Sequence, residues 1–216
     1  MDLTGIAGIT ALSLAVSGAA TGVSLVIGVP IGTWLAVRRF RSRGVVLSVV
    51  NTGMALPPVL AGLAVALLLW RSGILGGLGL MYTPAAMVIA EVVIATPVVI
   101  GLTYAALGSL DPRLETQLLG LGASRWQTTR WLWREARLPL LAAVMAAFGS
   151  VISEVGAAMM VGGNIAGQTR VLTTALVLET GRGAFGAAIV LGLVLLSLAF
   201  IVNGILTWAQ QRGQRR

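Results

Sequence analysis

Two carboxyl groups lie within apolar segments of the sequence, where an ionised side chain is costly unless it is paired or hydrated. Glu91 interrupts the apolar run from 82 to 107, and Glu154 interrupts the run from 138 to 161. We expect both side chains to face the interior of a helix bundle. Three roles stay open for Glu154: it holds a gate, relays protons, or contacts an anionic substrate despite their like charge.

A group of glycines and hydrogen-bond donors follows Glu154. Gly162, Gly163 and Gly167 permit irregular backbone, which at membrane depth is tolerated only where it is buried in protein or lines a cavity. Unpaired N–H groups of such backbone can hold an anion. Further donors lie beside these glycines, namely the neutral side chains of Asn164, Gln168 and Thr169 and the cation of Arg170. The alternative interpretation is a plain glycine-rich turn outside the membrane.

Several kinds of chemistry are excluded by residue types that the chain lacks. The sequence contains no Cys and no His, which removes thiolate and imidazole ligands for metals and the corresponding nucleophiles. All 15 basic residues are Arg, so no Lys is available for a phosphate-binding loop. We therefore expect no cofactor and no ATP hydrolysis by this chain; if ATP is used, a partner subunit hydrolyses it.

The elements that position these residues are transmembrane helices. Hydrophobic residues make up 57% of the 216 and charged residues only 10%, against about 25% in soluble domains. A spanning helix needs roughly 20 mostly apolar residues. The sequence predicts an all-α, polytopic membrane helix bundle with about five spans: Gly5–Val37, Val45–Trp70, Tyr82–Leu107, Leu138–Val161 and Ala184–Trp208.

The arginines predict the orientation of these spans. Arginines are enriched on the cytoplasmic side of membrane proteins. If the N-terminus lies outside and the C-terminus in the cytoplasm, twelve arginines fall in cytoplasmic segments, and only Arg71, Arg170 and Arg182 lie outside. This distribution accounts for the net charge of +8 without nucleic acid as a partner. The first charge is Asp2, and no basic segment precedes the first span, so we do not expect a cleaved signal peptide.

The segment from about 109 to 137 differs from the other loops because it predicts two short helices. Asp111 followed by Pro112 is a helix start, and Leu114, Leu118 and Leu121 form one apolar stripe. Ser124 with Gln127 is a capping box that opens a second helix, on which Trp126 and Trp133 share a face. The segment is either an amphipathic connector at the membrane surface or a docking element for a cytoplasmic partner.

Part of this loop resembles a known signature. Leu121-Gly122-Ala123-Ser124, followed later by Leu138-Pro139, is similar to the cytoplasmic loop of ABC importer permeases. The family's usual Glu-Ala-Ala is replaced here by Thr116-Gln117-Leu118, with the acidic residue one position earlier. The resemblance implies a type I importer fold, and it implies that this loop docks on the ATPase. The coupling residues would be Glu115, Gly122, Ala123, Ser124, Arg125 and Trp126.

Segments in the rest of the chain narrow the resemblance. Residues 56–63 resemble a segment of oxyanion permeases, and Ser153-Glu154-Val155-Gly156-Ala157 resembles a block of molybdate and sulfate permeases. The stretch from Gly162 to Thr180 looks most like tungstate permeases. This resemblance implies a homodimer in the cell inner (plasma) membrane that works with an ABC ATPase dimer and an extracytoplasmic oxyanion-binding protein. Under it, the translocation path or gate would contain Glu154, Gly162, Gly163, Asn164, Gln168, Thr169 and Arg170.

Three functions therefore compete. The first is a single transmembrane permease domain, residues 1–216, that imports tungstate, or alternatively molybdate or sulfate. The second is a self-standing proton-coupled carrier or channel that uses Glu91 and Glu154 as relays. Such carriers usually contain repeats and broken helices, and the sequence indicates neither. The third is an intramembrane enzyme, which ranks last because no two acidic residues have the spacing of a metal or acid/base pair.

Overall fold

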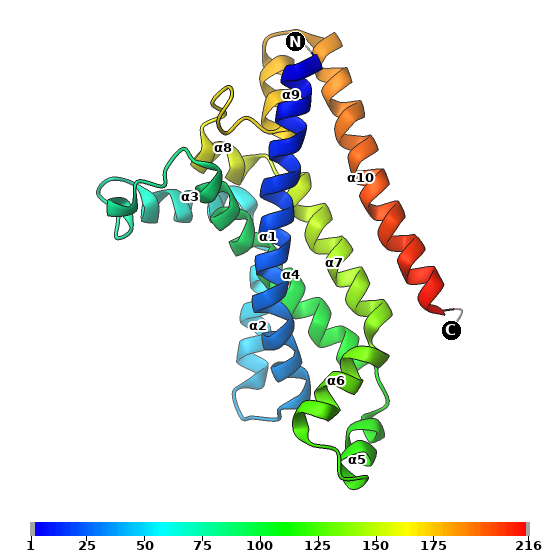
Figure 1. The fold of residues 1–216 in the computed structure, drawn as a ribbon. Helices are drawn as coiled ribbons and strands as arrows, with labels where there is room; N and C mark the ends of the chain where they lie inside the picture. Colours follow the sequence, from blue (N-terminus) through cyan, green and yellow to red (C-terminus); the bar gives the residue numbers. More distant parts are fainter. Residues whose placement is uncertain (1–2, 215–216) are drawn as a thin grey trace.

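The structure is a computed structural model that describes residues 3–214 and places them in a helical bundle (Figure 1). Asp2, Arg215 and Arg216, which entered the sequence predictions, lie outside the described residues. Among the described residues every regular element is a helix. In chain order they are α1 (Leu3–Val37), α2 (Arg43–Met54), α3 (Pro58–Leu69), the 3₁₀ helix η1 (Gly76–Leu78), α4 (Pro84–Gly108), α5 (Pro112–Gly120), α6 (Arg125–Glu135), α7 (Arg137–Ile152), α8 (Gly156–Gly162), α9 (Leu172–Gly181) and α10 (Phe185–Gln214).

Three of these helices, α1, α4 and α10, are each long and apolar enough to cross a membrane, as predicted. Two bent helix pairs, α2 with α3 and α6 with α7, bring the number of spans to five if each pair is counted as one. The chain is therefore an integral, multi-pass membrane protein, in agreement with its mean hydropathy of +0.94.

The second predicted span, Val45–Trp70, is not one helix. The axes of α2 and α3 differ by 98°, and Figure 1 shows α3 lying across the direction of α2. The cause is the pair Pro57-Pro58: a proline has no N–H for the helix ladder and disfavours helical backbone in the residue before it. Pro58 then serves as the first residue of α3, where a missing N–H costs nothing.

The fourth predicted span, Leu138–Val161, is also interrupted. The helix α7 ends at Ile152, and α8 begins at Gly156 in a new direction. The Ser153 hydroxyl donates to the Gly149 carbonyl at 2.8 Å, a local bond that competes with the regular ladder. At its other end, α7 meets α6 at 72°, close to Pro139. The sequence indicated no broken helix, and that expectation is wrong.

The close contact of α1 with α4 forms the centre of the bundle. A Cβ atom at Gly28 would lie 2.7 Å from the Val99 side chain, and one at Gly32 would lie 2.7 Å from the Ile100 carbonyl oxygen. Only a glycine fits at this separation, which is the small-residue packing expected between helices in lipid. The two helices are therefore in contact along several turns, and a displacement of one acts on the other.

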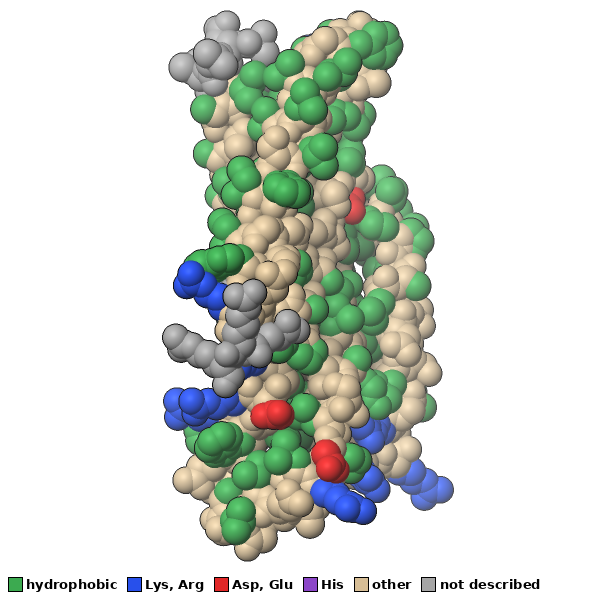
Figure 2. All heavy atoms as spheres, turned by 90° about the vertical axis from the view of Figure 1, so that its right-hand side faces the viewer, with side chains coloured by type: hydrophobic (Ala, Val, Ile, Leu, Met, Phe, Trp, Pro, Cys, Tyr) green, Lys and Arg blue, Asp and Glu red, His purple; other side chains and the backbone are tan. Residues whose placement is uncertain are grey.

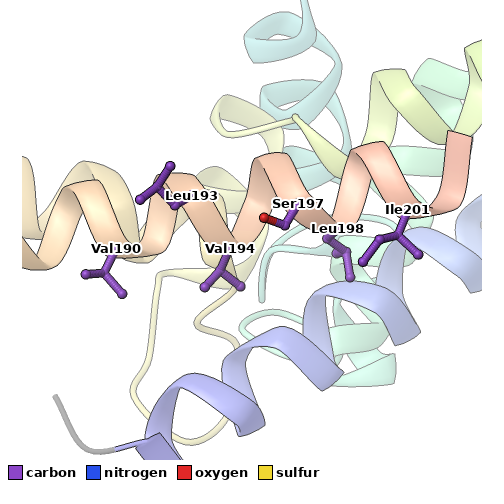
Figure 3. A pocket seen from close by; sticks show the side chains of 6 residues that line it. All are labelled: Val190, Leu193, Val194, Ser197, Leu198 and Ile201. Carbon is purple, nitrogen blue, oxygen red and sulfur yellow. The ribbon is translucent and has the colours of Figure 1, made fainter. Parts of the chain in front are cut away.

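Arginine side chains gather toward one end of the molecule. The α1–α2 turn, α5 and α6 lie together at the lower end of Figure 1, and the arginines visible in Figure 2 lie in the lower half of that face. In contrast, only 11% of the most apolar stretch of α10 is buried. A groove of about 390 Å³ runs along one side of α10, as Figure 3 shows, and is lined by Val190, Leu193, Val194, Ser197, Leu198 and Ile201. Such an uncovered apolar face requires lipid or another protein surface as its neighbour.

Candidate functional site

The loop between α4 and α7 contains the two short helices that the sequence predicts. The Asp111 carboxylate accepts the Arg113 backbone N–H at 2.8 Å, with Pro112 in the first helical position of α5. At the start of α6, Gln127 Oε1 accepts the Ser124 N–H at 2.7 Å, and Ser124 Oγ accepts the Gln127 N–H at 3.3 Å. The predicted cap of α5 and the predicted capping box of α6 are both confirmed.

A tight turn, Leu121–Ser124, joins the two helices, and we call α5, this turn and α6 the elbow. Gly122 has φ +85°, a left-handed conformation that favours glycine. The Gly122 and Ala123 N–H groups donate to the carbonyls of Leu119 and Leu118 and so close the end of α5. Because the helix ends here, Leu121 leaves the predicted stripe: its side chain is 85% exposed at the tip, whereas Leu114 packs inward.

The elbow is attached to the bundle through α6. The Trp133 indole N–H donates to the Thr33 hydroxyl on α1 at 2.8 Å, and that hydroxyl donates in turn to the Val29 carbonyl at 2.7 Å. The neighbouring residue Leu132 packs in a buried cluster with Leu107 at the end of α4. The elbow is therefore in direct contact with both central helices. No local sequence pattern predicts the bond between Thr33 and Trp133, because the two residues are 100 positions apart.

The predicted coupling residues all lie on this elbow. Gly122, Ala123 and Ser124 form its turn. Glu115, Arg125 and Trp126 line a cavity of about 550 Å³ between the elbow and the last turns of α1. The Trp126 ring meets the Trp133 ring edge to face, with centroids 6.0 Å apart, so the predicted shared face of the two tryptophans is confirmed.

Glu154 lies in the break between α7 and α8 and holds the surrounding backbone. Its Oε1 accepts the Ala157 N–H at 3.0 Å at the start of α8. Its backbone carbonyl accepts the hydroxyl of Thr173, on α9, at 2.8 Å. Glu154 therefore fixes the junction of three helices, whatever further role it has.

Glu91 lies inside the bundle close to this junction. Its side chain is only 3% exposed, and its Oε2 has no hydrogen-bond partner among the residues that the structure describes. The carboxyl groups of Glu91 and Glu154 are near enough to interact electrostatically. The burial of Glu91 agrees with the prediction, whereas Glu154 is only half-buried. Their proximity was not apparent from the sequence because the two residues lie far apart along the chain.

The glycine-rich segment after α8 is a compact loop held by its own side chains. Gly163, with φ +70°, ends α8. The Thr169 hydroxyl is fully buried, where it donates to the Gly162 carbonyl at 2.5 Å and accepts the Ile165 N–H at 3.0 Å. The Thr169 hydroxyl therefore acts as both a donor and an acceptor within its own loop.

Asn164 and Arg170 are bonded to each other across the same loop. Asn164 has φ +52°, and its Oδ1 accepts the Arg170 Nε–H at 3.1 Å. Its amide nitrogen donates to the Thr174 carbonyl at 3.4 Å. Gln168 is exposed, and together with Arg170 it lines a cavity of about 470 Å³ against the first turns of α1. Of the predicted donors, only Gln168 is exposed without a bond in the described loop, and Arg170 lines the cavity while its guanidinium is bonded to Asn164. Asn164 and Thr169 maintain the shape of the loop.

Comparisons with known proteins agree with this arrangement. Residues 28–214 match the family model described as "Binding-protein-dependent transport system inner membrane component". A probable anion ABC transporter permease of Haloferax volcanii is 39% identical over 95% of this chain and 90% of its own. A tungstate uptake system permease of Peptoclostridium acidaminophilum is 38% identical over 93% and 88%. Among solved structures, an inward-facing MetNI methionine ABC transporter has the same fold, with a TM-score of 0.74 at 20% identity, over 94% of this chain and 93% of its own.

Proposed function

We propose that this chain, which belongs to the binding-protein-dependent transport system inner membrane component family, is the permease subunit of an ABC importer that carries tungstate into the cytoplasm. The main support for tungstate as the substrate is the 38% identity to a tungstate uptake permease over 93% of the chain. The identity of 39% to a probable anion permease supports an oxyanion in general. Molybdate and sulfate, which belong to the same chemical class, are the alternatives that the uptake experiment separates.

The chain is a membrane subunit without enzymatic activity, so the energy for transport comes from a separate ATPase. We place the ATPase contact at the tip of the elbow, where Leu121 is exposed and the backbone turns at Gly122. Motion of the ATPase would displace α6, and the Trp133–Thr33 bond would pass that displacement to α1. Because α1 and α4 are in contact through Gly28 and Gly32, the two helices would then move together.

The path for the anion runs, in this proposal, past the loop that follows α8. Arg170 supplies positive charge and Gln168 a neutral donor at the cavity beside the start of α1. Neutral donors hold an anion loosely enough for it to leave as well as enter. Thr169 and Asn164 hold the loop in shape, and Glu154 holds the junction below it.

The remaining parts of the assembly are proposals as well. Residues 1–216 form one transmembrane domain with a cytoplasmic loop at about 109–137, an external N-terminus and a cytoplasmic C-terminus. A dimer of permeases, a dimer of ATPase subunits and an extracytoplasmic oxyanion-binding protein complete the importer. The uncovered apolar faces of the bundle and the small number of spans support pairing with a second copy.

The bent helices and the neighbouring carboxyl groups favour one competing function, a self-standing carrier driven by protons. Broken helices are a feature of such carriers, and Glu91 with Glu154 places two ionisable groups together inside the bundle. The two functions differ in their source of energy, ATP for the importer and a proton gradient for the carrier. An uptake experiment can supply either source separately.

The test is tungstate uptake into proteoliposomes that contain the permease and its cognate ATPase, with binding protein added outside. We expect uptake that requires ATP inside the vesicles and stops when the ATPase is omitted. The variant Ala123→Arg, at the tip of the elbow, should lose uptake, whereas Gln117→Arg, which also adds a cation to the elbow but on α5 away from the tip, should retain it. Uptake driven by a pH gradient without ATPase would instead establish the carrier.

A further inference from the structure

A second feature of the elbow is the cavity that separates it from α1. It has a volume of about 550 Å³, within the range of about 300–1,000 Å³ typical of ligand sites. One wall is the end of α1, and the other is formed by α5 and α6. We call it the elbow cavity; the lining residues that matter for its chemistry are Trp34, Arg38, Glu115, Arg125, Trp126 and Trp133.

The elbow cavity lies at the level of a membrane surface. The apolar stretch of α1 runs from Gly5 to Val37, and the charged segment begins at Arg38. Because the cavity extends from Pro30 to Arg38 along α1, it spans the border between hydrocarbon and headgroups. Trp34 and Trp126, which are 49% and 64% exposed, are the residue type that concentrates at this border.

The charged side chains of the cavity are arranged to receive an anion. The guanidinium groups of Arg38 and Arg125 have no hydrogen-bond or ion-pair partner within the part of the chain that the structure describes. They approach the cavity from opposite walls, Arg38 from the end of α1 and Arg125 from the first residue of α6. Glu115 contributes one negative charge, so the lining carries a net charge of +1.

The rest of the lining suits a hydrocarbon chain. The cavity is walled mainly by apolar surface, including Pro30, Val37 and Leu119. The Thr33 hydroxyl, which would otherwise be a polar group in this wall, is occupied by Trp133. A ligand that matches the site therefore has an anionic head for the arginines and an apolar tail for the lower part of α1.

We propose that the elbow cavity binds one anionic phospholipid of the surrounding leaflet, with its phosphate between Arg38 and Arg125 and an acyl chain against α1. Basic pockets between helices at this depth are known sites for anionic headgroups. The lipid fills the space between α1 and the elbow and so supports the Trp133–Thr33 connection from the open side. The site does not depend on which substrate is transported.

The test is native mass spectrometry of the purified permease–ATPase complex after reconstitution in an equal mixture of phosphatidylglycerol and phosphatidylcholine. We expect the wild type to retain phosphatidylglycerol selectively. The double variant Arg38→Gln/Arg125→Gln should retain about 30-fold less, since each arginine adds to the attraction for an anionic lipid. The matched control is Arg41→Gln/Arg130→Gln, which removes one charge from each of the same two segments but none from the cavity lining.

A second variant, Thr129→Trp, fills the cavity and leaves every charge in place, and it should also release the lipid. Equal loss of lipid from both double variants would overturn the proposal, because the attraction would then be a general effect of surface charge. Release of phosphatidylglycerol by inorganic phosphate at constant ionic strength would show that the site recognises a free anion only. Retention of phosphatidylglycerol by the permease alone, with none retained by the permease–ATPase complex, would assign the cavity to the ATPase interface. None of these outcomes depends on tungstate uptake, so this proposal and the proposed function fail separately.

Discussion

Replacing Thr33 by valine removes the hydroxyl that accepts the Trp133 indole N–H and preserves the shape of the side chain. Thr33 is buried, and the bond is 2.8 Å long. Leaving a buried donor without a partner costs about 1–3 kcal/mol. Trp133 is half-buried, so its indole N–H can form a hydrogen bond with water in place of Thr33. We therefore expect a cost at the lower end of this range, about 1 kcal/mol, which corresponds to about fivefold in an equilibrium constant.

If the elbow moves α1 through the Trp133–Thr33 bond, loss of this bond should weaken the coupling of ATP hydrolysis to transport. In proteoliposomes with ATPase and binding protein, Thr33→Val should lower tungstate uptake per ATP hydrolysed by about fivefold. ATP hydrolysis itself should be nearly unchanged. Thr33→Ser keeps the acceptor and serves as the control. Since Trp133→Phe already breaks the bond, adding Thr33→Val to it should cause little further loss. Equal coupling ratios for Thr33→Val, Thr33→Ser and wild type would refute this route of transmission.

Three further predictions follow from the site. Thr169→Val removes the two hydrogen bonds that hold the loop after α8, at a cost of about 2–4 kcal/mol in folding free energy. It should therefore lower thermal stability in detergent and reduce uptake. Thr169→Ser keeps the hydroxyl and should retain both stability and uptake. Glu154→Gln retains an acceptor for the Ala157 N–H, so uptake and its dependence on pH should stay close to wild type in a transport assay from pH 6 to 8; a shifted pH profile would support a proton relay instead. Gly62→Leu should prevent α3 from packing on α8, since even a Cβ atom would lie 2.6 Å from the Ala157 Cα, and a normal yield of folded protein in size-exclusion chromatography would contradict that contact.

The sequence was most informative about local structure. The ends of α5 and α6 followed from Asp111, Pro112 and the Ser124–Gln127 pair because helix capping depends on residues within one turn. Three long spans followed from apolar length alone. The two broken spans were missed because hydropathy measures how apolar a segment is and not its direction. Pro57-Pro58 was the available signal for one of the breaks.

Contacts between distant segments could not be read from a single sequence. The pairing of Thr33 with Trp133 and the approach of Glu91 to Glu154 depend on how the helices pack, and no local pattern specifies that packing. The same limit applies to Thr169: it was predicted as a donor for an anion, and its hydroxyl is buried within its own loop. The anion-path role of Gln168 and Arg170, which do face a cavity, remains a prediction.

The central claim is that the chain imports tungstate, and cellular metal content tests it most directly. The gene would be deleted and restored on a plasmid, and cellular tungsten, molybdenum and sulfur would be measured by elemental mass spectrometry with each oxyanion supplied at a limiting concentration. We expect the deletion to lower tungsten alone and the plasmid to restore it. A loss of molybdenum or sulfur in place of tungsten would contradict the assignment of substrate, and unchanged levels of all three would contradict oxyanion import by this chain.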